Sequence, residues 1–299
     1  MVKLVDLEKL GIAIDKIKEL FAAVNAAIDG KADTEHSHTK AEITDFPESL
    51  KNPNALTVKV GDVTSTYDGS DAVTVSVEAV MEEEINDAIK QLYVNNYDGS
   101  ESQLNMLIEL SGGLSETVNV GDDANVYICN NGDAYLAGSG ATNDFPWSEL
   151  PFENNEAIKV LYILNGITTI GDNIFPYSSV LTKVYMGDTV TSLGESAFEA
   201  CTSLTNIYLS KELKNIGANA FKDCESIENI VMPDSVVSLG EWSAFESCIS
   251  LKSIILSNAL TNIPDDTFAE CESLTSITIP SSVTSIGSDA FWNCDNLTT

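Results

Sequence analysis

The stretch Leu274-Thr275-Ser276-Ile277-Thr278-Ile279-Pro280 opens a segment that recurs along the C-terminal half of the chain. Apolar and polar residues alternate in it, which predicts a strand with Ile277 and Ile279 facing inward. The segment then runs through Ile286-Gly287 to a phenylalanine and a cysteine. The phenylalanines recur every 23 or 24 residues, at Phe175, Phe198, Phe221, Phe245, Phe268 and Phe291.

A segment this short cannot bury its own apolar residues, so the copies must stack and share one core. The pattern predicts a solenoid of six coils over residues 157–299. Gly follows the apolar residue that precedes the phenylalanine in five copies, and Pro264 replaces it in the remaining copy. The one 24-residue interval comes from the inserted Trp242.

These residues resemble the BspA-type leucine-rich repeat, whose pattern runs approximately L-x-x-I-x-I-P-x-x-V-x-x-I-G-x-x-A-F-x-x-C. The copy from Leu274 to Cys294 matches that pattern most closely. The preceding stretch, Leu136 to Trp147, looks like the strand and cap that come before such solenoids. The resemblance implies surface recognition and adhesion, and it implies no catalytic residues.

Cysteine occupies one position of the repeat in five copies. Stacked neighbours could approach disulfide distance, or they could form a reduced, buried column of small apolar side chains; we favour the column. The spacing matches no compact zinc motif. The five residues are Cys201, Cys224, Cys248, Cys271 and Cys294.

An outward strand position carries Tyr162, Tyr185 and Tyr208 in successive copies, then Val231, Ile255 and Thr278. We expect the three tyrosines to form an exposed aromatic strip. Such a strip can bind a receptor, since a tyrosine offers both apolar area and a hydroxyl group. The alternative is that the rings only stabilise the sheet through cross-strand contacts.

The N-terminal 30 residues contain apolar residues at alternating spacings of three and four, which predicts a coiled coil. Isoleucine at both core positions favours three strands, so residues 1–30 are predicted to be a trimerisation and attachment helix. An ordinary amphipathic helix packed on its own chain is the alternative. The predicted seam consists of Leu7, Leu10, Ile14, Ile17, Phe21, Val24 and Ile28.

The next segment, residues 31–50, runs from Lys31-Ala32-Asp33 through His36-Ser37-His38 to Ile43-Thr44-Asp45-Phe46-Pro47. It resembles a joint found in tail fibres and related trimeric appendages of bacteriophages. In an extended chain His36 and His38 point to the same side, so three chains would present six imidazoles. That set suits an octahedral metal such as iron, and a solvated linker is the alternative.

The segments that follow are shorter modules. Residues 51–80 resemble a small β module common in such appendages. Residues 81–115 are predicted as a helical spacer, with helices at Met81–Leu92 and Glu101–Leu110. Residues 116–156 are predicted as a β cap with short strands around Asn130-Asn131-Gly132-Asp133, a turn signal. The fold class is therefore multidomain: a trimeric coiled coil, small β-rich and α+β linkers, and a repeat solenoid.

The charge narrows the range of functions. The chain has 299 residues and a formal net charge of −31, and its 15 basic residues are all lysines. Nucleic-acid binding and attachment to an anionic membrane are disfavoured, because both need cations. No membrane-spanning apolar run and no catalytic motif is recognised, so we expect no enzymatic activity.

Together these patterns predict a bacteriophage virion fibre: a homotrimeric tail fibre or receptor-binding protein, made in the host cytoplasm and exposed on the particle. Its N-terminus would contact other virion proteins, and its repeats would bind a bacterial surface glycan or protein. Two alternatives stay open. One is a head (capsid) fibre. The other is a bacterial BspA-like surface adhesin, which needs an export signal that the N-terminal residues do not resemble.

Overall fold

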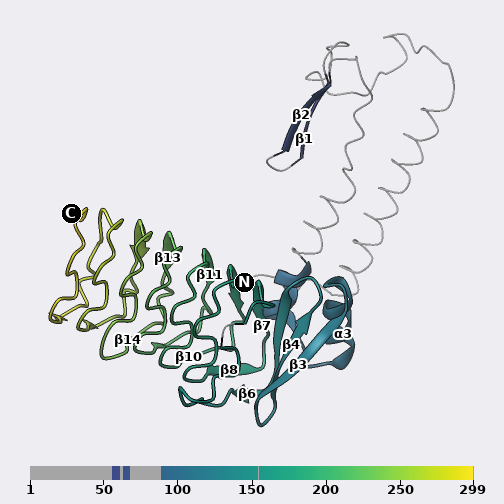
Figure 1. Cartoon of the computed structure of the whole chain (residues 1–299). Helices are drawn as coiled ribbons and strands as arrows, with labels where there is room; N and C mark the ends of the chain where they lie inside the picture. The colour runs from purple at the N-terminus through teal and green to yellow at the C-terminus, as the bar shows by residue number, and fades with distance from the viewer. Residues whose placement is uncertain (1–55, 61–62, 68–88, 154, 299) are drawn as a thin grey trace. The chain divides into compact units, whose positions relative to one another are not determined.

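A computed structural model describes residues 56–60, 63–67, 89–153 and 155–298, in two compact units that divide after Val75 (Figure 1). In the first unit, β1 (Leu56–Val60) and β2 (Val63–Tyr67) pair antiparallel, with Leu56 opposite Tyr67. These strands lie inside the predicted small β module. The predicted coiled coil (1–30) and joint (31–50), with His36 and His38, lie outside the described residues.

The second unit contains a solenoid with two rows of short parallel strands, one along each edge of the ribbon in Figure 1. It makes about seven turns, one more than the six predicted. The first strand row holds β5 (Asp133–Gly138), β7 (Val160–Ile163), β9 (Lys183–Met186), β11 (Asn206–Tyr208), β13 (Asn229–Val231) and β15 (Ser253–Ile255). The second strand row holds β6 (Gly140–Ala141), β8 (Ile167–Ile170), β10 (Ser192–Leu193), β12 (Asn215–Ile216), β14 (Ser238–Leu239), β16 (Asn262–Ile263) and β17 (Ser285–Ile286).

The additional coil comes from the segment predicted as a β cap. Strand β5 pairs parallel with β7, and β6 pairs parallel with β8, as in the later coils. Phe152 ends this coil, and its ring stacks on Phe175 with centroids 4.9 Å apart. The sequence pattern missed the coil because the glycine and cysteine of the repeat are not found around Phe152.

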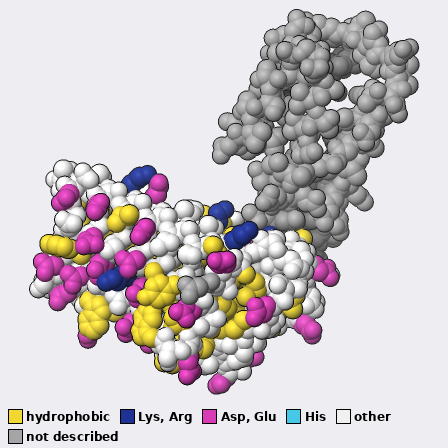
Figure 2. Space-filling model, in the orientation of Figure 1, with side chains coloured by type: hydrophobic (Ala, Val, Ile, Leu, Met, Phe, Trp, Pro, Cys, Tyr) yellow, Lys and Arg dark blue, Asp and Glu magenta, His cyan; other side chains and the backbone are white. Residues whose placement is uncertain are grey.

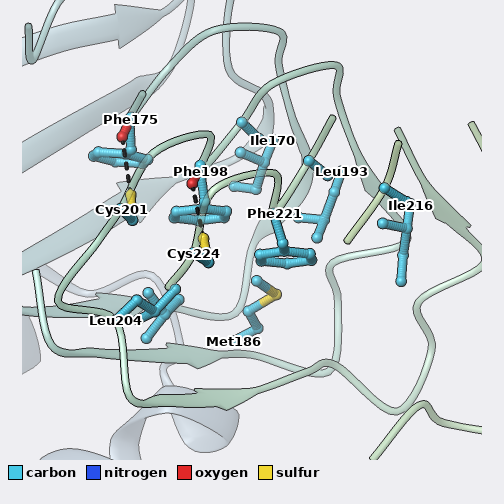
Figure 3. Close-up of a cluster of buried hydrophobic side chains, with 14 of the residues drawn as sticks. Ile170, Phe175, Met186, Leu193, Phe198, Cys201, Leu204, Ile216, Phe221 and Cys224 are labelled. Carbon is cyan, nitrogen blue, oxygen red and sulfur yellow. Dashed lines mark hydrogen bonds between the residues drawn. The ribbon is translucent and has the colours of Figure 1, made fainter. Parts of the chain in front are cut away.

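The phenylalanines form one continuous column inside the solenoid, with neighbouring centroids 4.9 to 5.7 Å apart. Five of the rings, from Phe175 to Phe268, have no exposed surface. Each cysteine donates its S–H to the carbonyl oxygen of the phenylalanine two positions up this column, as Figure 3 shows for Cys201 and Phe175, 3.3 Å apart. All six cysteines are free thiols, and only Cys294 is more than slightly exposed. The predicted buried column is therefore present.

The glycine of the repeat is needed because neighbouring coils touch there. A Cβ atom on Gly217 would lie 2.4 Å from the carbonyl carbon and oxygen of Gly194. At the same place the N–H of each coil bonds to the coil before it, for example Gly240 N to Ile216 O at 2.7 Å. Pro264 has no N–H to give, so the second strand row is interrupted between β14 and β16.

Two helical segments and a hairpin precede the solenoid. Residues 89–96 are helical, and α3 (Glu101–Leu110) begins at Ser100, whose side chain accepts a hydrogen bond from Gln103 N. The predicted helix at Glu101–Leu110 is confirmed. β3 (Leu114–Gly121) and β4 (Ala124–Cys129) pair antiparallel, and β4 pairs antiparallel with β5, which adds the hairpin to the first strand row.

In the last coil the prediction for Ile279 is wrong. Its side chain is 36% exposed and Ile277 is half-buried, because no further coil of the described residues packs over them. Trp292 is also exposed in this coil. Among the described residues, no helix has the length and apolar character to span a bilayer.

Candidate functional site

The outward face of the first strand row carries two parallel columns of side chains. The strand register places Tyr162 beside Tyr185 and Tyr185 beside Tyr208. The same pairing extends the column to Tyr135, which the sequence analysis had not included. The tyrosine column is Tyr135, Tyr162, Tyr185 and Tyr208, continued by Val231 and Ile255. The second column is Asp133, Val160, Lys183, Asn206, Asn229 and Ser253.

The four tyrosine rings form a regular stack. Their centroids are 5.2, 5.2 and 4.6 Å apart, and the last pair is inclined by only 3°. Neighbouring strands in a sheet lie about 4.8 Å apart, so rings at one register position stack almost face to face. The ring planes therefore lie across the direction in which the coils advance.

The predicted exposure of the strip is wrong for two of its three members. Tyr162 is 2% exposed and Tyr185 is 8% exposed, whereas Tyr208 is 50% exposed. Residues 89–96 and α3, here called the helical cover, pack on the first tyrosines through Val94, Leu104, Leu107 and Ile108. The cover forms a second hydrophobic core outside the sheet, and it ends before Tyr208.

Buried polar contacts fasten the cover to the sheet. The Nζ atom of Lys90 lies 2.7 Å from Asp133 Oδ2, with both side chains almost fully buried. Ser111 Oγ donates to the same carboxylate at 2.8 Å and shares a 2.6 Å hydrogen bond with the Tyr135 hydroxyl group. Gln91 Nε2 donates to the Tyr185 hydroxyl group at 3.2 Å. A buried ion pair holds only in a defined geometry, so these bonds locate the edge of the cover.

Beyond the cover lies what we call the open face: Asn206, Tyr208, Asn229, Val231, Ser253 and Ile255. Val231 is 65% exposed and Ile255 is 61% exposed. None of the six residues is charged, although the chain carries a net charge of −31. Acidic side chains are spread over the surface drawn in Figure 2, with few lysines among them. Loss of charge together with exposed aromatic and aliphatic groups is typical of the centre of an interface.

A groove of about 550 Å³ lies where the cover ends and the open face begins. Tyr208 and Val231 line it together with polar residues of both sides. Its amide side chains come from Gln91, Asn95, Asn206 and Asn229. The sequence analysis missed these amides because asparagine is common in turns, and only the strand register brings Asn206 and Asn229 to one face.

The amides of the groove keep unused hydrogen-bonding groups. Asn206 Oδ1 accepts from Thr205, and Asn229 Oδ1 accepts from Ser253 at 2.7 Å. Within residues 89–153 and 155–298, neither Nδ2 atom has a hydrogen-bond partner. The charges at the rim form a pair, Lys211 Nζ and Asp188 Oδ2, 3.1 Å apart. The groove therefore presents amide donors and one apolar ring, and no isolated charge.

Metal and nucleophile chemistry find little support in the described part of the chain. No group of three or more His, Cys, Asp or Glu residues suited to a metal occurs in that part. Burial raises the pKa of Cys201 to about 12, and that of Cys248 equally, so these thiols stay protonated at neutral pH. The metal at His36 and His38 and the absence of enzymatic activity stay predictions.

Known proteins resemble the C-terminal part of the chain. Among solved structures, a T. pallidum leucine-rich repeat protein is 22% identical, with 56% of this chain and 85% of that chain covered and a TM-score of 0.48. A leucine-rich repeat protein from Eubacterium ventriosum is also 22% identical, covering 60% and 64%, with a TM-score of 0.41. A leucine-rich cell surface protein from Faecalibacterium prausnitzii is 22% identical, covering 62% and 54%, at 0.41. This chain thus spans less than two thirds of the last two proteins.

No curated protein is similar enough in sequence to match the chain. The model of the BspA type leucine-rich repeat region matches residues 168–298, in 6 copies. These are the copies that carry the phenylalanine and cysteine columns. The C-terminal part of this protein is therefore a BspA-type leucine-rich-repeat domain.

Proposed function

We propose that the protein is a surface recognition protein, and that its repeat domain attaches to an uncharged macromolecular target through the open face. The observation that carries this proposal is the absence of charge from six outward positions in a chain with 46 acidic and 15 basic residues. A solvated face would be expected to hold some of those charges. Attachment of this kind corresponds to the adhesin alternative, which the BspA-type repeat favours over the virion fibre.

The geometry supports binding of a partner more than chemical conversion of a substrate. The open face is shallow and runs along several coils, so it suits an extended partner with repeated weak contacts. Tyr208, Val231 and Ile255 supply apolar area, and Asn206, Asn229 and Ser253 supply hydrogen-bonding groups beside them. Exposed apolar groups surrounded by polar ones are the usual composition of a recognition surface.

The test compares two double variants of the full chain. Val231→Asp with Ile255→Asp places two charges on the open face. Val237→Asp with Ile249→Asp places the same charges on exposed residues outside it. Fluorescently labelled proteins are applied to a panel of bacterial and epithelial cells, and bound fluorescence is measured by flow cytometry. The first variant should bind about ten-fold more weakly than wild type, because burying an unpaired charge opposes association.

The control variant should bind like wild type, and both variants should keep the circular dichroism spectrum. If both variants bind equally, or if no surface of the panel binds wild type, attachment through the open face is wrong.

A further inference from the structure

The tyrosine column stops one ring short inside the groove. We propose that the free place above Val231 receives a sugar ring of a neutral glycan, which stacks on Tyr208 and is held by the amides of Asn206 and Asn229. This inference rests on the proposed function and names the class of its ligand.

The geometry of the stack defines the place. Tyr185 covers one face of the Tyr208 ring, with centroids 4.6 Å apart and planes inclined by 3°. The other face of the ring looks toward the next coil, where the column position holds Val231. A valine fills much less of that rung than a tyrosine would, and both residues line the groove. A flat ring of similar thickness can therefore continue the column at the spacing that the coils impose.

The polar atoms around this place suit hydroxyl groups. Asn206 and Asn229 each lie two residues before a column position, on the same side of their strands. Their Nδ2 atoms can donate to sugar oxygens without breaking a bond in the described structure. On the opposite side of the groove, Asn95 Oδ1 already accepts from Asp188 N at 2.9 Å, which leaves its Nδ2 atom as another donor.

Charge separates a neutral glycan from the other candidates. The net charge of −31 repels uronic acids, sialic acids and phosphorylated glycans at long range. The lysine at the groove, Lys211, is already paired with Asp188. An aromatic side chain of a protein could also fill the place, but it would leave the amide donors unused, and unused donors oppose burial.

The experiment uses the cells that bind wild-type protein. One sample is treated with periodate, which cleaves vicinal diols of sugars, and another with a broad protease. Binding of the full chain should be lost after periodate and kept after protease. Neutral gluco-, manno-, galacto- and N-acetylhexosamine oligosaccharides are then added as competitors, with a polyuronate as the charged comparison, and a neutral member should compete.

Three variants test the place itself. Tyr208→Ala should bind about ten-fold more weakly, and Tyr208→Phe should retain most binding, because stacking requires the ring and not the hydroxyl group. Val231→Tyr should abolish binding by completing the column, while thermal stability is kept. Val237→Tyr, an exposed change outside the open face, should bind like wild type.

Binding that survives periodate but is lost after protease overturns the glycan, and so does full binding by Val231→Tyr. In either case the aspartate variants still decide the open face separately, so failure of this inference is distinguishable from failure of the proposed function.

Discussion

At the scale of single residues, the cysteine column couples burial to protonation. Each thiol of the inner coils is surrounded by apolar side chains and donates to a phenylalanine carbonyl oxygen, at 3.2 Å for Cys224 and Phe198. Desolvation disfavours the thiolate and raises the pKa of Cys201 and of Cys248 from 9.0 to about 12. The same position would be reactive only if the coils separated.

This shift predicts a loss of stability at alkaline pH. The folded pKa lies above the unfolded one, so the contribution of each thiol is complete below about pH 9 and is lost as pH rises toward 12. We expect the melting temperature of wild type to fall more steeply between pH 8.5 and pH 10.5, flagged as roughly that window, than that of the Cys201→Ala, Cys248→Ala variant. Both proteins share the same lysines and tyrosines. Scanning calorimetry over this range measures the two slopes.

The half-buried Cys294 provides the control. Its pKa is raised less completely by burial, so Cys294→Ala should leave the slope close to that of wild type. Equal slopes in wild type and the double variant would contradict the coupling.

At the scale of elements, the helical cover decides how much of the tyrosine column meets solvent. Leu107 is fully buried between α3 and the sheet. Repeat coils interact mainly with their neighbours, so damage to the cover should stay close to the strands that it contacts.

We therefore predict that Leu107→Ala lowers the free energy of unfolding by about 2–5 kcal/mol, because it leaves a cavity in the second core. Hydrogen exchange should become faster in β5 and β7 and stay unchanged in β13 and β15. Mass spectrometry of exchanged peptides measures this. Leu114→Ala, at a side chain that is 48% exposed, is the control and should change neither quantity. Loss of protection in every coil would show that the cover and the solenoid unfold together.

At the scale of the whole molecule, the trimer stays a prediction, since the heptad seam lies outside the described residues. Three linked repeat domains would raise the strength of attachment well above that of one. The prediction bears on function as well, because a trimer agrees with the fibre interpretation and a monomer favours a single-chain adhesin.

Light scattering with size separation tests it. Wild type should have three times the mass of one chain. Ile14→Asp, which places a charge in the seam, should give monomers. Ile12→Asp, on the opposite side of the same predicted helix, should leave the trimer intact. A monomeric wild type would remove the coiled coil and, with it, the argument for a fibre.

The sequence by itself determined the repeat: the stacking of the coils, the phenylalanine and cysteine columns, the helix at Glu101–Leu110 and the glycine of the repeat. Each of these depends on neighbours one coil away, and the period of 23 or 24 residues repeats the same environment until it can be recognised. The tertiary structure alone decided which tyrosines are exposed and where the groove lies. Burial of Tyr162 and Tyr185 depends on residues 89–110, which are far from them in sequence and follow no period. Docking of that cover depends on one buried contact set around Asp133, so no local pattern could have predicted that only Tyr208 remains open.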